Sequence, residues 1–120
     1  MNYTFYNANP NSHYVNDCTI RAISLAEGKS WDETYDELSE IAQKNRIILD
    51  DVNFIEPFLD ERYERECFED VYVGEFAENH PYGTYLITMD GHITCCINGV
   101  IYDTFNCLNR MMKCAWFVHI

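Results

Sequence analysis

Three residues of this 120-residue chain have side chains that together could perform nucleophilic catalysis: Cys18, His92 and Asp103. His92 and Asp103 lie on either side of the dipeptide Asn98-Gly99. This dipeptide is the strongest short-range signal for a β-hairpin, because both residues tolerate the positive φ of a type I′ turn. Side chains alternate along a strand, so the two-residue turn places His92 diagonally next to Asp103 on one face of the hairpin. An imidazole beside a carboxylate is what a general base and its orienting partner require.

Cys18 is the candidate nucleophile. It follows Asp17, a suitable N-cap, at the start of a helix predicted to run to Glu27 and to stop at Gly28. Free amides and the positive end of the helix dipole favour a thiolate there, and the same amides can stabilise an oxyanion on a substrate. By spacing alone, a buried structural cysteine on a helix is the commoner interpretation. Arg21, four residues after Asp17, is expected to have a capping or ion-pair role on the helix face, with substrate binding as the less favoured alternative.

The rest of the pattern predicts an α+β fold in a single domain that spans residues 1–120. Ser30 and Glu33 match the spacing of a capping box, which indicates the start of a second helix. Helices come first and an antiparallel meander comes last, so the sheet should pack on the early helices. The other predicted elements are an N-terminal arm with one strand up to residue 16, a short helix at about 51–59, and strands at 83–89 and 115–120.

The chain is strongly acidic, with 20 acidic and 8 basic residues and a net charge of -12. This charge disfavours direct binding to nucleic acid phosphates. Between Glu56 and Glu78, nine acidic residues oppose only Arg62 and Arg65, a local balance of -7. Two interpretations remain open: a solvated face that keeps the protein in solution, or a surface that recognises a basic partner or imitates DNA.

The six cysteines are expected to be reduced thiols. The sequence has neither the order of a secretory signal nor an apolar run long enough to cross a membrane, so we expect a cytoplasmic protein without a membrane partner. It contains no Cys-x-x-Cys pair, and its cysteine spacings are not those of a zinc site. We therefore expect no metal and no cofactor.

Two blocks of the sequence form a specific combination: Asp-Cys-Thr-Ile-Arg-Ala at 17–22, and Gly-His at 91–92 with Tyr-Asp-Thr at 102–104. Weaker blocks are Asn-Ala-Asn-Pro at 7–10, residues 28–35 and residues 80–85. Together these blocks resemble a family of small, uncharacterised papain-like cysteine-peptidase domains of bacteriophages and prophages. The resemblance covers most of the chain and leaves out residues 45–76.

The resemblance implies a papain-like fold, with N-terminal helices packed on a C-terminal antiparallel sheet. It also implies Cys18 as nucleophile, His92 as base and Asp103 as the residue that orients His92, with Asp17 and Arg21 in support. Papain-like enzymes usually place a Gln or Asn about six residues before the cysteine to complete the oxyanion hole, but here that position is a serine. The alternative donors are, in order of preference, Asn16, Asn11 and Asn9.

Two functions are therefore expected. The first is a cysteine peptidase or related thiol acyl-transfer enzyme that acts on a protein or peptide amide; hydrolysis, deamidation and transglutamination all remain open. The second is a phage-encoded acidic protein that keeps the fold but works by binding a basic host protein, such as a defence nuclease, by mimicking nucleic acid. Either would act in the cytoplasm of a bacterial host, and the sequence sets no oligomeric state.

Overall fold

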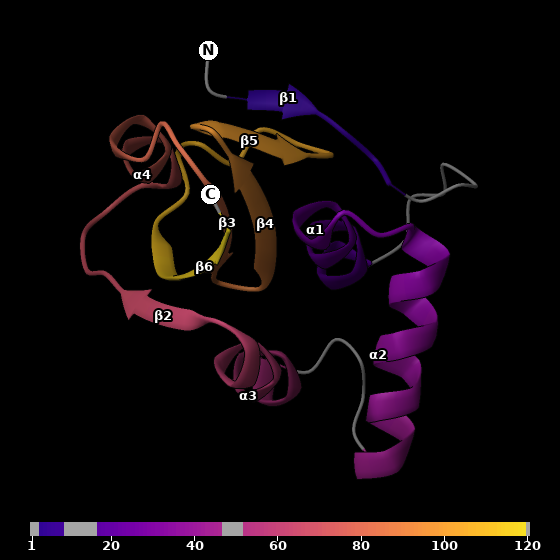
Figure 1. Cartoon of the computed structure of the whole chain (residues 1–120). Coiled ribbons are helices and arrows are strands. Elements are labelled where there is room, and N and C mark those ends of the chain that lie inside the picture. The colour runs from indigo at the N-terminus through magenta and orange to yellow at the C-terminus, as the bar shows by residue number, and fades with distance from the viewer. Residues whose placement is uncertain (1–2, 9–16, 47–51, 120) are drawn as a thin grey trace.

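A six-stranded mixed sheet forms the centre of the computed structural model, which describes residues 3–8, 17–46 and 52–119. Four helices surround the sheet within these residues, so the fold is α+β, as predicted. The elements are arranged as Figure 1 shows. The helices are α1 (Cys18–Glu27), α2 (Trp31–Asn45), α3 (Val52–Arg62) and α4 (Val73–Asn79), and the strands are β1 (Tyr3–Phe5), β2 (Glu64–Cys67), β3 (Thr84–Met89), β4 (His92–Ile97), β5 (Val100–Asp103) and β6 (Met112–His119).

Local signals set the ends of α1 and α2. Helix α1 has the predicted bounds and ends at Gly28, which adopts the left-handed conformation with φ 69°. Helix α2 begins with the predicted capping box: the Ser30 hydroxyl accepts a hydrogen bond from the Glu33 amide, and the Glu33 carboxylate accepts one from the Ser30 amide. Asp17 occupies the predicted N-cap position of α1, and its carbonyl accepts a hydrogen bond from the Arg21 amide. Within the described part of the chain, its side chain makes no capping hydrogen bond and instead contacts other side chains.

The strands lie in the order β1-β5-β4-β3-β6-β2. The predicted hairpin of β4 and β5 is confirmed: Ile97 pairs with Val100, and both turn residues, Asn98 and Gly99, have positive φ (50° and 79°). The predicted antiparallel pairing of the C-terminal strands is confirmed for β3, β4, β5 and β6, but the sheet as a whole is mixed, because β1 pairs with β5 in the parallel sense. Such pairing joins segments about a hundred residues apart, so no local pattern announces it.

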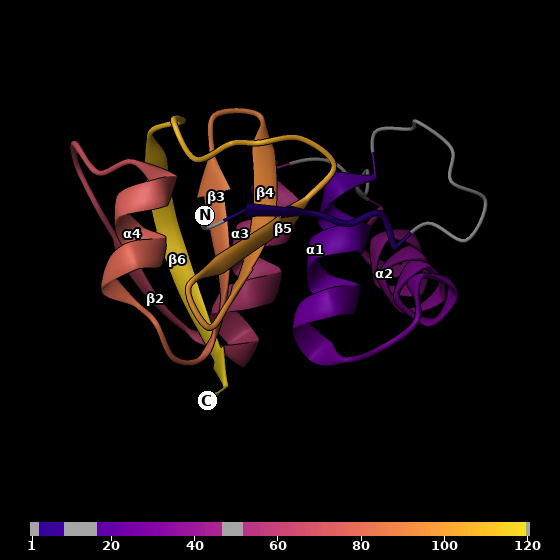
Figure 2. The same cartoon turned by 90° about the horizontal axis from the view of Figure 1, so that it is seen from above.

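The sheet separates two apolar clusters. Helix α1 and helix α4 lie on opposite sides of it (Figures 1 and 2). One cluster gathers α1, α2 and α3 around Trp116, and the other gathers α4 around Ile87 and Ile101. Within the described residues, no helix has the length and apolar character needed to cross a bilayer.

A disulfide joins Cys67 of β2 to Cys114 of β6. The two residues are opposite each other in the antiparallel pairing, with Cα atoms 4.0 Å apart. The prediction of six reduced thiols is therefore wrong for this pair. The other four are thiols; of these Cys95, Cys96 and Cys107 are buried, as expected of small apolar residues.

Candidate active site

Cys18 is the first residue of α1, which packs closely against β4. Burial raises the pKa of the Cys18 thiol, but hydrogen bonds from the His92 ring and the Ile93 backbone, together with the positive charges of His92 and Arg21, outweigh burial. The pKa of Cys18 therefore lies below its usual value. A lowered pKa increases the thiolate fraction, and the thiolate is the nucleophilic form of cysteine.

His92 lies between Cys18 and Asp103. Its Nε2 atom is 2.7 Å from Oδ2 of Asp103, which leaves Nδ1 as the ring nitrogen that can face the thiol. Burial lowers the pKa of His92, but Asp103 and Cys18 more than compensate and raise it to about 9. Phe105 covers the imidazole, with ring centroids 4.8 Å apart, and only 9% of the His92 side chain is exposed. The structure thus favours a charged imidazolium next to Cys18, whose own pKa is lowered.

The turn that precedes His92 fixes its place on β4. Met89 pairs with His92 across the dipeptide Asp90-Gly91, which forms a second two-residue hairpin loop. This loop was not predicted from the sequence. Gly91 has φ 70°, and a Cβ atom on it would meet no other atom within 4 Å. Glycine is therefore required here by backbone conformation and not by lack of space.

Asp103 is almost fully buried, at 4% exposure, and both of its carboxylate oxygens have hydrogen-bond partners. Besides His92, it accepts a hydrogen bond of 2.7 Å from the Thr104 amide, and the Cys107 thiol lies 3.8 Å away. Burial raises the pKa of Asp103, but hydrogen bonds from His92 and Thr94 and the charge of His92 hold it below its usual value. Asp103 is therefore held as a carboxylate that can fix the orientation of the ring.

The edge strand β1 and the residue that follows it bind the backbone of Asp103. The Asp103 carbonyl accepts hydrogen bonds from the Tyr6 amide (2.8 Å) and from the Tyr3 hydroxyl (3.2 Å). The sequence predicted one strand in this N-terminal arm but gave no sign that it lies next to the site. The N-terminal arm thus stabilises the position of a residue about a hundred positions later in the chain.

Arg21 and Asp17 connect the site to α2. They form the predicted ion pair, and the Trp31 indole donates a hydrogen bond of 2.8 Å to the other carboxylate oxygen of Asp17. Arg21 also lies near the carboxylate of Asp103, with Nη2 3.9 Å from Oδ1. The Arg21 side chain is 12% exposed and that of Asp17 only 4%, so this pair is shielded from water. The pair of Asp17 and Arg21 thus lies between Trp31 of α2 and the carboxylate of Asp103.

The candidate oxyanion donors Asn16, Asn11 and Asn9 lie outside the described residues. Next to the thiol there is a cavity of about 10 Å³ bordered by Cys18 and Arg21. Such a volume is close to the minimum of about 10–15 Å³ that holds one water molecule. Two aromatic residues, Tyr6 of the N-terminal arm and Tyr102 of β5, also line this cavity.

The described residues contain no group of three or more His, Cys, Asp and Glu side chains placed to hold a metal ion. No protein-family model matches the chain, and searches among curated proteins and solved structures find no significant match either. The chemistry of Cys18, His92 and Asp103 must therefore be judged on its geometry.

Proposed function

We propose that the protein is a papain-like cysteine enzyme that cleaves or transfers a protein or peptide amide. Cys18 would be the nucleophile, His92 the general base and acid, and Asp103 the residue that orients His92. One observation carries the proposal: the His92 ring interacts with the Cys18 thiol while its Nε2 atom is held 2.7 Å from Asp103. This is the order of groups that nucleophilic catalysis by cysteine requires.

The arrangement of elements supports a papain-like architecture. The nucleophile begins a helix, and that helix packs on the strand that carries the base. Free amides at the start of α1 and the dipole of the helix favour both the thiolate and an oxyanion on the bound substrate. The start of α1 would thus favour both the formation of the nucleophile and the stabilisation of the oxyanion that forms when it attacks.

The reaction would proceed through a thioester. The Cys18 thiolate attacks the amide carbonyl, and the His92 imidazolium then gives its proton to the leaving nitrogen as the C–N bond breaks. Neutral His92 next takes a proton from water, whose oxygen attacks the thioester and releases Cys18 with a carboxylic acid product. A glutamine side chain as substrate would give deamidation by the same steps, and an amine in place of water would give transfer.

A mixture of peptides from a bacterial proteome tests the proposal. The wild-type protein and the Cys18→Ala variant are each incubated with the mixture, which is then compared by mass spectrometry. We expect new peptide termini, deamidated glutamines or amine cross-links in the wild-type sample only. The kind of product distinguishes hydrolysis, deamidation and transfer, whereas identical mixtures from both proteins would count against an enzyme of this class.

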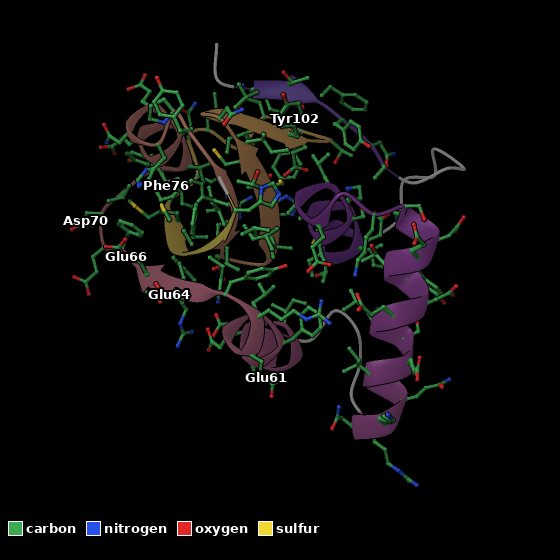
Figure 3. The ribbon with its side chains drawn as sticks, viewed as in Figure 1. Glu61, Glu64, Glu66, Asp70, Phe76 and Tyr102 are labelled. Carbon is green, nitrogen blue, oxygen red and sulfur yellow. A yellow bond between two sulfur atoms is a disulfide. The ribbon has the colours of Figure 1, made fainter. Side chains whose placement is uncertain are left out.

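A second candidate function is binding of a basic host protein by the acidic surface. Its acidic side chains project from α3, β2 and the following loop (Figure 3). In this case the protein would associate rapidly and lose affinity as salt rises. Cys18→Ser would leave the biological effect intact, whereas charge reversal at four exposed positions, Glu64, Glu66, Glu69 and Asp70, would abolish it.

A further inference from the structure

A second cavity, of about 140 Å³, lies beside α4 and the strands β2, β3 and β6. No residue that lines it takes part in the site at Cys18. Helix α4 lies on the opposite side of the sheet from α1, so the two sites are on different faces (Figure 1). Aromatic and acidic side chains line most of this second cavity: Phe76, His80, Tyr85, Phe117, Glu64 and Glu66.

Strand pairing places the acidic and aromatic side chains on one face. Glu64 pairs with Phe117, and Phe117 pairs in turn with Tyr85, so these three residues form a row across β2, β6 and β3. Residues opposite each other in an antiparallel pair project to the same side. In the next row, Glu66 pairs with Ala115, whose small side chain leaves space beside the carboxylate.

The aromatic rings form a continuous wall around Tyr85. The ring centroids of Phe76, His80 and Phe117 are 5.1, 5.2 and 5.3 Å from that of Tyr85. Gly83 allows this packing, because a Cβ atom there would lie 3.1 Å from the Phe117 ring and 3.4 Å from the Tyr85 ring. Two of the rings remain open to a ligand, since Phe117 is 41% exposed and Tyr85 is only half-buried.

The carboxylates of Glu64 and Glu66 are exposed and have no ion-pair partner among the described residues. Arg65 lies between them in sequence, but its guanidinium is 3.5 Å from Glu56 and 3.4 Å from Asp60. Arg65 is among the residues that line the cavity, but alternation along β2 directs its guanidinium to the other face of the strand, 5.9 Å from the centroid of the Trp116 ring. The two negative charges at the cavity are therefore not neutralised by the nearest basic residue.

Glu66 also influences the aromatic wall directly. Burial raises the pKa of the Tyr85 phenol, and the negative charge of Glu66 contributes to the rise. Glu66 and Tyr85 also line the same cavity, so the carboxylate and the ring can act on a single ligand group.

We propose that this cavity binds an arginine side chain of a basic polypeptide partner. A planar guanidinium stacks on aromatic rings, as Phe117 and Tyr85 provide, and its several N–H groups can donate to two carboxylates at once. The size is suitable, because an apolar cavity of about 150 Å³ admits a benzene molecule. The net charge of -12 would draw a basic partner towards the protein before it docks.

Titration with defined peptides, followed by the NMR signals of the backbone amides, tests this site. The probe is the capped peptide Gly-Gly-Arg-Gly-Gly, compared with peptides that carry citrulline or lysine in place of arginine. Citrulline has nearly the same shape as arginine but no charge. We expect saturable shifts around Tyr85, Ala115 and Phe117 with the arginine peptide, and an affinity lower by about tenfold or more for citrulline, because a charge-assisted hydrogen bond is lost.

Two double variants that change the net charge equally distinguish binding at the cavity from general electrostatic attraction to the protein. Glu64→Gln/Glu66→Gln should lose about tenfold in affinity for the arginine peptide. Asp36→Asn/Glu40→Gln removes two exposed charges of α2 that lie outside both the cavity and the acidic stretch 56–78, and it should bind as the wild type does. Phe117→Leu keeps both carboxylates and should also weaken binding, with unchanged signals elsewhere as the check on folding.

The proposal is overturned if the arginine peptide causes no saturable shift or if the citrulline peptide binds equally well. Equal losses in the two double variants would overturn it too, because attraction would then depend on total charge. Tighter binding of the lysine peptide would show that the cavity does not select a planar guanidinium. None of these outcomes depends on the reactivity of Cys18.

Discussion

The His92 ring and the Asp103 carboxylate are 2.7 Å apart because a two-residue turn folds β5 back onto β4. Asp103 is fixed in turn by the Thr104 amide and by the edge strand β1. The bond through Nε2 leaves Nδ1 of His92 for the thiol of Cys18. One short hydrogen bond therefore decides both the orientation and the charge of the candidate base.

Asp103→Asn should lower the pKa of His92. In the wild type this pKa is about 9, and Asp103 is the main cause of the rise. An asparagine keeps the shape but removes the negative charge that stabilises the imidazolium. NMR titration of the His92 ring protons measures the effect; a wild-type pKa near the ordinary value of about 6.5 would contradict this account.

Amide turnover should depend on pH through two groups with opposite requirements. The activity rises as Cys18 loses its proton, at a pH below the usual range for a thiol, because its pKa is lowered. It falls as His92 loses its proton at about pH 9, because the imidazolium must protonate the leaving nitrogen. The pH profile of turnover should be bell-shaped, and activity that continues to rise well above about pH 10 would be inconsistent with this role for His92.

Arg21→Met should destabilise the fold by about 3 kcal/mol, because it leaves the shielded carboxylate of Asp17 without its main charged partner. Asp17→Asn/Arg21→Met should cost less than the single variant, because neither charge is then left alone. Urea unfolding measures both. A loss under about 1 kcal/mol for Arg21→Met would show that water replaces the guanidinium readily.

Four thiols, and not six, should react when the protein is unfolded without reductant, because Cys67 and Cys114 form a disulfide. The bond closes a loop with a sequence separation of 47, so its removal should lower the free energy of unfolding by about 2–4 kcal/mol. Cys67→Ser/Cys114→Ser, unfolded in urea beside the wild type, provides the measurement. Six reactive thiols in the unreduced protein would refute the pairing.

Much of the candidate site could be predicted from sequence because its signals are local. Gly28 ends α1, and Asn98 and Gly99 make the turn that brings His92 near Asp103. Each of these features depends on the backbone preferences of one or two residues. The ion pair of Asp17 and Arg21 was also predictable from local sequence, because helix periodicity places residues four positions apart on the same face.

The parts that sequence did not reveal depend on contacts between distant segments. The parallel pairing of β1 with β5 places Tyr3 and Tyr6 at Asp103, and nothing near either tyrosine indicates it. Strand β2 is short and fully exposed, so it lacks the alternation of polar and apolar residues by which strands are recognised. The disulfide between Cys67 and Cys114 could not be predicted either, because the two cysteines come together only through the pairing of β2 with β6.

The rate at which iodoacetamide modifies each free cysteine at about pH 6 tests the central claim most directly, because an ordinary thiol with a pKa of about 8.5 is almost fully protonated there. Burial raises the pKa of Cys96 to about 11 and that of Cys107 to about 12, and it raises that of Cys95 further. Cys18 should therefore be labelled first, and His92→Ala should slow its labelling by about tenfold or more while His119→Ala leaves it unchanged. Labelling of Cys18 that is no faster than that of the buried thiols, or that is equally fast in His92→Ala, would contradict a thiolate–imidazolium pair at this site.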